Sequence, residues 1–268
     1  MGKKLYLLKI GGSLIAGQKN PNEIHKREIK RILTEIDAAR RLVGFDVIIG
    51  HGSAAPGHVP SQKYGVSAGF TGERAMYGSV LTERACSRLN DVVVQTALDI
   101  GMPVFSFSPH SFSTTISSVI SNIYIEPVEI ALRNGMVPII YGDVLMDYVQ
   151  GFSDISTEKL LAAFARRLHP EKVIFCTDVD GVFDSNPKLE KSAKFIHAVN
   201  RRTIKEVISR AGPSLKIDVT GGMKTKVSLL YDAVKGTTAK GYILNGTVRG
   251  AIYRFLTGKR TKHTVVMW

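Results

Sequence analysis

Four glycine-containing segments carry the residue types that could do chemistry in this chain. They are Lys9-Ile10-Gly11-Gly12-Ser13, Gly50-His51-Gly52, Tyr141-Gly142-Asp143 and Thr220-Gly221-Gly222-Met223. Glycine lets the backbone approach an anion closely and present its N–H groups, and a helix N-terminus behind such a loop adds partial positive charge. Any one segment could simply end a strand. Four together, with lysines and a histidine, predict a phosphate-binding site.

Lys9 is the residue of these segments that is hardest to explain as purely structural. It interrupts the apolar run 4–10, where a buried ammonium group without a partner would be costly. We therefore predict that Lys9 has a functional role.

The elements that must position these loops alternate between strands and helices. Short apolar runs predict strands at 4–10, 45–49, 103–107, 137–141, 172–177, 241–245 and 264–267. Helical spacing of apolar residues predicts helices at about 29–43, 73–100, 125–134, 156–168, 201–211 and 222–235. The Ser-rich segment 106–121 is expected to be an irregular loop, a hairpin or a substrate lid. This alternation predicts one α/β domain over 1–268, with a mainly parallel sheet and helices on both faces.

The composition narrows the class of protein. The 268 residues include 36 Lys+Arg and 23 Asp+Glu, a net charge of +13, with 44% apolar residues, which is typical of a soluble globular protein. Basic residues are mixed with acids and lack interleaved aromatic residues, so we expect no nucleic-acid partner. No run approaches the roughly 18 apolar residues of a spanning helix. Two cysteines are too few for a disulfide framework. We expect a cytoplasmic protein without a membrane partner.

Familiar ligand motifs are missing or incomplete. The P-loop pattern G-x-x-x-x-G-K-[ST] does not occur. Gly50-x-Gly52-x-x-Ala55 meets a loose dinucleotide fingerprint, but Pro56-Gly57 is expected to break the helix that should begin there. The segment 178–181 lacks the ligands of a calcium loop, and we assign no metal-ligating residue.

Taken jointly, the motifs resemble the amino acid kinase superfamily and, within it, the isopentenyl phosphate kinase family. The resemblance runs nearly end to end and is carried by Lys9-x-Gly11-Gly12-Ser13, Gly57-His58, Tyr141-Gly142-Asp143-Val144, Thr177-Asp178-Val179-Asp180-Gly181-Val182 and Asp218-Val219-Thr220-Gly221-Gly222-Met223 with Lys226. The family choice depends mainly on His58, which fosfomycin kinases share. The resemblance implies a three-layer αβα sandwich with roughly eight strands. Its N-terminal part would hold mainly the acceptor and its C-terminal part mainly ATP.

The implied activity is ATP-dependent phosphorylation of isopentenyl phosphate, an isoprenoid monophosphate, with Mg²⁺ on the nucleotide and a homodimeric assembly. Lys9 would bridge the β- and γ-phosphates, Lys226 would hold ATP from the other side, and His58 would donate to the acceptor phosphate. No strong general base is needed, because a phosphate monoester already carries anionic oxygens.

Further site residues follow from the same motifs. ATP-binding residues would also include Gly11, Gly12, Ser13, Ser53, Asp178, Asp180, Gly181, Gly221 and Gly222, and acceptor-binding residues Gly52, Gly57, His58 and Thr157. Asp178 and Asp180 could equally cap turns, and Lys226 could be a solvated charge on a helix. His51 is expected to be structural.

The acceptor pocket is expected to be apolar around an isoprenoid tail. The helix from Glu73 to Asp99 is a candidate wall, with Met76, Val80 and Leu81 as candidate lining residues.

The sequence departs from the family pattern at three places. The loop 51–58 carries Ser53 and Ala54 where the family has glycines, which restricts the backbone. Glu158 stands where the family has an aspartate that orients the lysines. Gln18 stands where the family usually has a second lysine. A one-residue insertion in the preceding loop would bring Lys19 to that position, so Lys19 is the candidate transition-state stabiliser.

Two alternatives stay open at this point. The altered loop leaves room for a fosfomycin kinase-like or other small-acid kinase. A non-catalytic nucleotide-binding protein would keep the fold without turnover.

Overall fold

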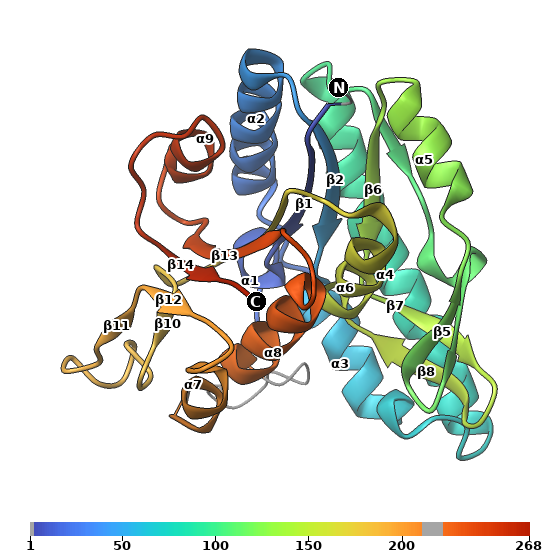
Figure 1. Cartoon of the computed structure of the whole chain (residues 1–268). Helices are drawn as coiled ribbons and strands as arrows, with labels where there is room; N and C mark the ends of the chain where they lie inside the picture. The colour runs from blue at the N-terminus through green and yellow to red at the C-terminus, as the bar shows by residue number, and fades with distance from the viewer. Residues whose placement is uncertain (1–2, 211–221) are drawn as a thin grey trace.

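The centre of the molecule is an eight-stranded sheet, seen in a computed structural model that describes residues 3–210 and 222–268. The strand order is β12-β14-β13-β9-β1-β2-β6-β3 (Figure 1). All neighbouring pairs are parallel except β13 with β14. The strands are β1 (Leu5–Ile10), β2 (Asp46–His51), β3 (Val104–Ser106), β6 (Val137–Tyr141), β9 (Lys172–Thr177), β12 (Ala198–Val199), β13 (Lys240–Asn245) and β14 (His263–Val266).

Helices cover both faces of this sheet, so the predicted αβα layering is confirmed. One buried apolar cluster joins the sheet to α1 (Gly12–Ile15), α2 (Lys26–Val43), α4 (Glu73–Asp99) and α9 (Ala251–Leu256). A second cluster joins the other face to α5 (Glu126–Arg133), α6 (Thr157–Leu168), α7 (Ile204–Arg210) and α8 (Gly222–Val234). The two-residue strands and the six-residue α9 were not predicted, because such short elements carry too few residues to show a period.

Strand β1 shows how the two-residue period of a strand divides the core. Tyr6, Leu8 and Ile10 belong to the first cluster, whereas Leu7 belongs to the second. Lys9 therefore shares the face of Leu7, which α6 covers. The position of Lys9 in the apolar run thus directs its side chain toward the N-terminus of α6.

A smaller four-stranded sheet, ordered β5-β4-β7-β8, lies beside the main one. Its strands are β4 (Ser113–Ile116), β5 (Val119–Ile123), β7 (Asp143–Asp147) and β8 (Gly151–Ile155). The Ser-rich segment therefore forms a hairpin, preceded by the short helix η2 (Pro109–Ser111). A further two-stranded sheet pairs β10 (Val182–Phe183) with β11 (Phe195–Ile196).

The prediction that Pro56-Gly57 breaks a helix after β2 is wrong. Helix α3 (Ala54–Tyr64) begins two residues before the proline and is followed by η1 (Val66–Ala68). Pro56 lies in the first turn, where backbone N–H groups have no acceptor within the helix, so its missing N–H removes no hydrogen bond.

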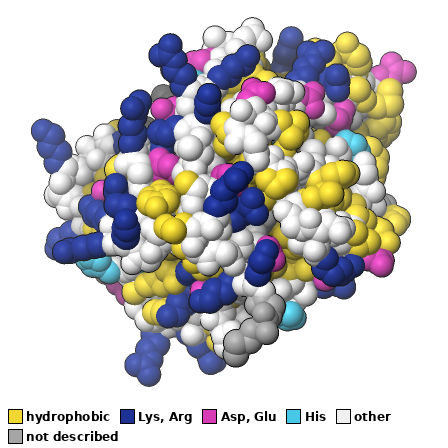
Figure 2. Space-filling model, turned by 90° about the horizontal axis from the view of Figure 1, so that it is seen from above, with side chains coloured by type: hydrophobic (Ala, Val, Ile, Leu, Met, Phe, Trp, Pro, Cys, Tyr) yellow, Lys and Arg dark blue, Asp and Glu magenta, His cyan; other side chains and the backbone are white. Residues whose placement is uncertain are grey.

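The surface mixes charges of both signs. On the face shown in Figure 2, Lys and Arg side chains lie among acidic and apolar ones and do not form one stripe. None of the described helices is long and apolar enough to cross a membrane.

Gly50 marks a close approach between the sheet and α6, and it gives a test of the packing. A Cβ on Gly50 would lie 2.5 Å from Thr157 Cγ2 and 3.2 Å from Leu161 Cδ1. We predict that Gly50→Ala lowers the free energy of unfolding by about 2 kcal/mol, as overpacking of a core does. Urea unfolding measures this change.

Thr157→Ser provides the control. It removes the crowding methyl group but keeps the hydroxyl that donates to the His51 carbonyl oxygen at 2.6 Å. The double variant should recover most of the lost stability, and a double variant as unstable as Gly50→Ala alone would contradict the packing.

Candidate functional site

A cleft of about 530 Å³ lies at the carboxyl ends of β9, β1, β2 and β6. Open α/β sheets bind ligands at this edge. The predicted site residues that line it are Lys9, Gly11, Gly12, Ser13, Lys19, Gly52, Ser53, His58, Thr157, Glu158, Asp178, Gly181, Gly222 and Lys226. Residues far apart in the sequence, from both halves of the chain, therefore surround one space.

Three predicted residues do not appear in this lining. Asp180 accepts hydrogen bonds from Asn245 Nδ2 at 3.0 Å and Lys262 Nζ at 2.9 Å. Gly57 is buried in α3, where a Cβ would lie 2.8 Å from Cys86 Sγ. These contacts favour structural roles for both residues. Gly221 lies outside the described residues.

A buried ion pair lies at the floor of the cleft. Lys9 Nζ donates to Glu158 Oε1 at 2.7 Å, and the two residues are only 6% and 4% exposed. Burial raises the pKa of the Glu158 carboxyl, but the positive charges of Lys9 and Lys226 outweigh that effect and hold the pKa below its ordinary value. Glu158 therefore stays ionised and fixes the position of Lys9.

Helix α6 places Glu158 there because of how the helix begins. Ser156 is the N-cap, and its side chain accepts from the backbone N–H of Lys159 at 3.4 Å. A carboxylate in the first turn suits the positive end of the helix dipole. The first turn of α6 thus aims Glu158 at the face of β1 that carries Lys9.

The loops after β1 and β2 touch through their backbones. A Cβ on Gly12 would lie 2.8 Å from Ala54 N, and a Cβ on Gly52 would lie 3.0 Å from Gly12 N. Ala54 has a φ of +47°, a left-handed conformation that costs an L-residue about 1–2 kcal/mol. The departure from glycine at this position is therefore accommodated as local strain.

Two acidic residues line the two ends of the cleft. Asp154 of β8 lies at the end that holds His58, and Ser61 Oγ donates to Asp154 Oδ2 at 2.7 Å. Asp178 lies at the other end, paired with Lys188 from the segment between β10 and β11. Sequence reasoning missed Asp154 and Lys188. The one available signal for Asp154 was an acid between Ser153 and Ile155, two residues before Ser156-Thr157-Glu158.

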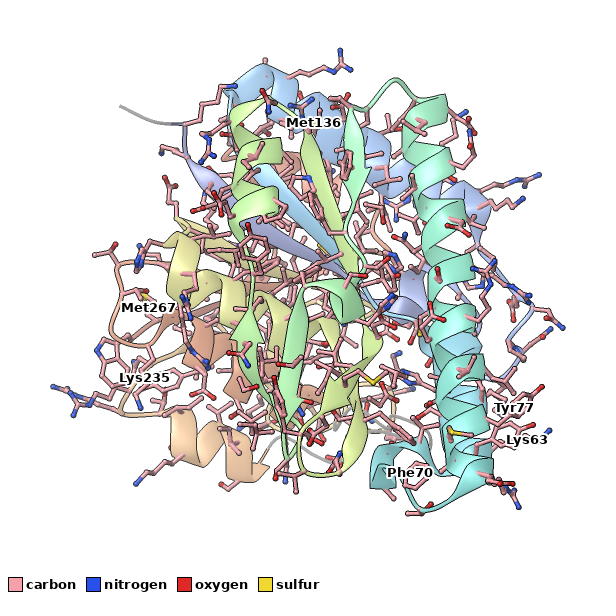
Figure 3. The ribbon with its side chains drawn as sticks, turned by 90° about the vertical axis from the view of Figure 1, so that its right-hand side faces the viewer. Lys63, Phe70, Tyr77, Met136, Lys235 and Met267 are labelled. Atoms are coloured by element: carbon pink, nitrogen blue, oxygen red, sulfur yellow. The ribbon has the colours of Figure 1, made fainter. Side chains whose placement is uncertain are left out.

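The prediction that α4 forms an apolar wall is wrong. Met76 is 49% exposed and Val80 58% exposed, and neither they nor Leu81 line the cleft. Figure 3 shows Tyr77, from the same turn of α4, at the outer margin of the molecule. The buried face of this turn is made of small residues, including Ala75 and Gly78.

His51 contacts the protein and does not line the cleft. Its Nε2 lies 3.2 Å from Asn90 Oδ1, and its ring stacks on Tyr141 with centroids 5.7 Å apart. Burial lowers the pKa of His51 to about 4, so the imidazole is neutral. The expected structural role fits these contacts.

Comparison with known proteins identifies relatives along nearly the whole chain. The model of the amino acid kinase family matches residues 4–245. The isopentenyl phosphate kinase of Methanothermobacter thermautotrophicus is 35% identical over 97% of this chain and 98% of its own length. The isopentenyl phosphate kinase of Methanocaldococcus jannaschii is 27% identical over 95% of this chain and 96% of its own length. A crystal structure described as an isopentenyl phosphate kinase has a TM-score of 0.84 and 32% identity, covering 98% of this chain and 100% of that one.

The buried ion pair predicts a large loss of stability on removal of one charge. Glu158→Gln leaves Lys9 buried without its carboxylate, so we expect the free energy of unfolding at pH 7 to fall by about 3 kcal/mol. The exposed Glu190 provides a matched control, because Glu190→Gln should change stability by less than about 0.5 kcal/mol. Equal effects of the two variants in urea unfolding would contradict the pairing.

The neutral state of His51 predicts a dependence of stability on pH. The folded pKa of about 4 lies below the ordinary value of 6.5, so the contribution is complete above pH 6.5 and is lost as pH falls toward 4. Between pH 7 and pH 5 the loss amounts to about 2 kcal/mol. His51→Gln should lack this part of the pH dependence in urea unfolding. The same slope in both proteins would show that His51 is not the group responsible.

Proposed function

The chain belongs to the amino acid kinase family, and from that membership we propose that it transfers the γ-phosphoryl group of ATP to isopentenyl phosphate. The products are isopentenyl diphosphate and ADP. The observation that carries this proposal is that His58 and the Lys9–Glu158 pair line one cleft. A hydrogen-bond donor for an acceptor phosphate and cations for nucleotide phosphates thus face the same space. The names of the most similar relatives support the same acceptor.

Lys9 and Lys226 are proposed to stabilise the negative charge of the transferring group. They approach Glu158 from β1 and α8, and both line the cleft. Fixed cations aimed at developing charge are the main source of catalysis in phosphoryl transfer. Lys19, exposed at the rim of the cleft, is proposed as a third cation that approaches the same group.

The chemistry needs little more than this positioning. An anionic oxygen of the acceptor phosphate attacks the γ-phosphorus and forms a new P–O bond. The bond from the γ-phosphorus to the bridging oxygen breaks, and its electron pair leaves with ADP. His58, when protonated, offsets part of the repulsion between the two polyanions. The task of the protein is to hold both reactants in line.

A magnesium ion, when bound with ATP, would neutralise part of the negative charge of the phosphate groups. The described residues contain no group of three His, Cys, Asp or Glu side chains that could hold a metal. The carboxylates of the cleft already have partners: Lys9 for Glu158, Lys188 for Asp178 and Ser61 for Asp154. We propose that the nucleotide would hold the ion, and that Ser13 and Asp178, which line the cleft, would supply polar side chains beside it.

We propose that the N-terminal part of the chain binds mainly the acceptor and the C-terminal part mainly ATP. Residues 52–58 supply the acceptor end, and residues 177–188 with 222–226 supply the nucleotide end of one domain over 1–268. The family resemblance implies a homodimer that acts on small molecules, and we propose from the composition that it is cytoplasmic.

A panel of acceptors tests the proposed function. We expect ADP release with MgATP and isopentenyl phosphate or dimethylallyl phosphate, and none with fosfomycin or N-acetylglutamate. His58→Asn should lower kcat/KM by about 100-fold, as loss of one charge-stabilising donor does. The exposed His169→Asn is the matched control and should leave the rate unchanged.

The panel also has outcomes that would contradict the proposal. Turnover on fosfomycin alone would make the protein a small-acid kinase. ATP binding without turnover on any acceptor would make it a nucleotide-binding protein.

A further inference from the structure

Asp154 places a negative charge at the acceptor end of the cleft, where an incoming phosphate is itself negative. It lies on β8 and lines the cleft together with His58 of α3. Its Oδ2 accepts from Ser61 Oγ at 2.7 Å, and Ser61 is fully buried. Residues 58 and 61 are one helical turn apart and lie on the same side of α3. The carboxylate is therefore held against the part of α3 that carries His58.

The surroundings of Asp154 are largely apolar. Across the β7–β8 hairpin it is paired with Val144, which packs with Val66 and Phe152 in a small buried cluster. Burial raises the pKa of the Asp154 carboxyl, and the Ser61 hydroxyl and the positive charge of His58 oppose that rise. A carboxylate in this setting is stable as an anion only beside a hydrogen-bond donor and a cation.

Two other charged groups at this end of the cleft, Asp143 and Lys159, have partners of their own. Asp143 of β7 accepts from His110 Nδ1 at 2.7 Å. Lys159 of α6 donates to the Ser118 carbonyl oxygen at 3.1 Å. Other titratable groups near this end include Glu83 and Cys86 of α4, and Lys9, Glu158 and Lys226 line the same cleft. Burial raises the pKa of the Cys86 thiol, so that group stays neutral.

We propose that Asp154 is the positioning residue for His58: its carboxylate pairs with the His58 imidazolium and holds it, charged, toward the acceptor phosphate. Ser61 fixes one carboxylate oxygen against α3 and so holds the carboxylate in place for this pairing. The consequence for turnover rests on the proposed function, whereas the pairing itself does not.

Such a pairing matters because the acceptor is a dianion near neutral pH, since the second pKa of a phosphate monoester is about 6. An uncharged His58 would offset none of this charge. A carboxylate partner raises the pKa of a histidine, so His58 would stay charged to higher pH than a solvated histidine. Asp154 thereby extends the pH range in which the acceptor phosphate binds to higher pH.

The direct test is an NMR titration of the histidine side chains in the protein without substrates. In Asp154→Asn we expect the pKa of His58 to fall by about one unit relative to wild type, because an adjacent carboxylate shifts a titrating group by about that much. His110 is the internal control, since its carboxylate partner is Asp143 and its titration should not move. An unchanged His58 titration in Asp154→Asn would overturn the proposal.

A second variant, Ser61→Ala, tests the pairing in case Asp154→Asn does not fold. Ser61→Ala keeps both charges but frees the carboxylate, so the His58 pKa should fall by less than in Asp154→Asn while the protein stays folded. If Asp154→Asn does not fold, an unchanged His58 pKa in Ser61→Ala overturns the proposal.

Kinetics separate this inference from the proposed function. With isopentenyl phosphate, Asp154→Asn should raise the acceptor KM about tenfold at pH 8. The alkaline limb of the pH profile of kcat/KM should move to lower pH by the same amount as the pKa of His58 moves in the NMR titration. A lower kcat at unchanged acceptor KM, with an unmoved alkaline limb, would count against positioning. Absence of turnover in wild type would refute the proposed function, and the titration would still decide the pairing.

Discussion

The buried pair of Lys9 and Glu158 is the constraint on which the rest of the site depends. An ammonium group that is 6% exposed requires an opposite charge, and the fold supplies it from a helix that begins about 150 residues later in the chain. The sheet must therefore bring β1 and the start of α6 together. With β1 and the start of α6 in contact, the carboxyl ends of β9, β2 and β6 lie around the same cleft. The alternation of strand and helix thus creates the cleft as well as the core.

The loops of the cleft show how close contact limits the sequence. Gly12 and Gly52 allow the first two loops to touch, and neither position has room for a side chain. Ala54, by contrast, takes a conformation that favours glycine and keeps the path of the loop at the cost of strain. The acceptor end is also more polar than an isoprenoid tail alone suggests, because Asp154 and Ser61 lie beside His58. The proposed pairing of a charged His58 with Asp154 would reconcile that polarity with a phosphate acceptor.

The sequence was sufficient to predict the fold and most of the cleft. Lys9 could be recognised from the residues alone, because it interrupts an apolar strand that ends at glycines, where a parallel sheet binds its ligands. His58, Glu158 and Lys226 were identified through the resemblance to the isopentenyl phosphate kinase family. The path of α3 was mispredicted because Pro56 was read as a breaker without regard to its place in the first turn. The contacts of Asp154 and Lys188 depend on side-chain packing between distant segments, which no local pattern records. The exposed positions Met76 and Val80 were misassigned because a long helix with small buried residues has its larger apolar side chains outside.

We propose that this cleft transfers the γ-phosphoryl group of ATP to the phosphate of an isoprenoid monophosphate. Phosphorus NMR of wild type with MgATP and isopentenyl phosphate tests it most directly, because the acceptor resonance and the fate of the γ-phosphate are read in one spectrum. We expect the monophosphate signal to be replaced by the two doublets of a diphosphate ester, in step with the appearance of ADP. ADP accompanied by inorganic phosphate, with the acceptor signal unchanged, would contradict the claim.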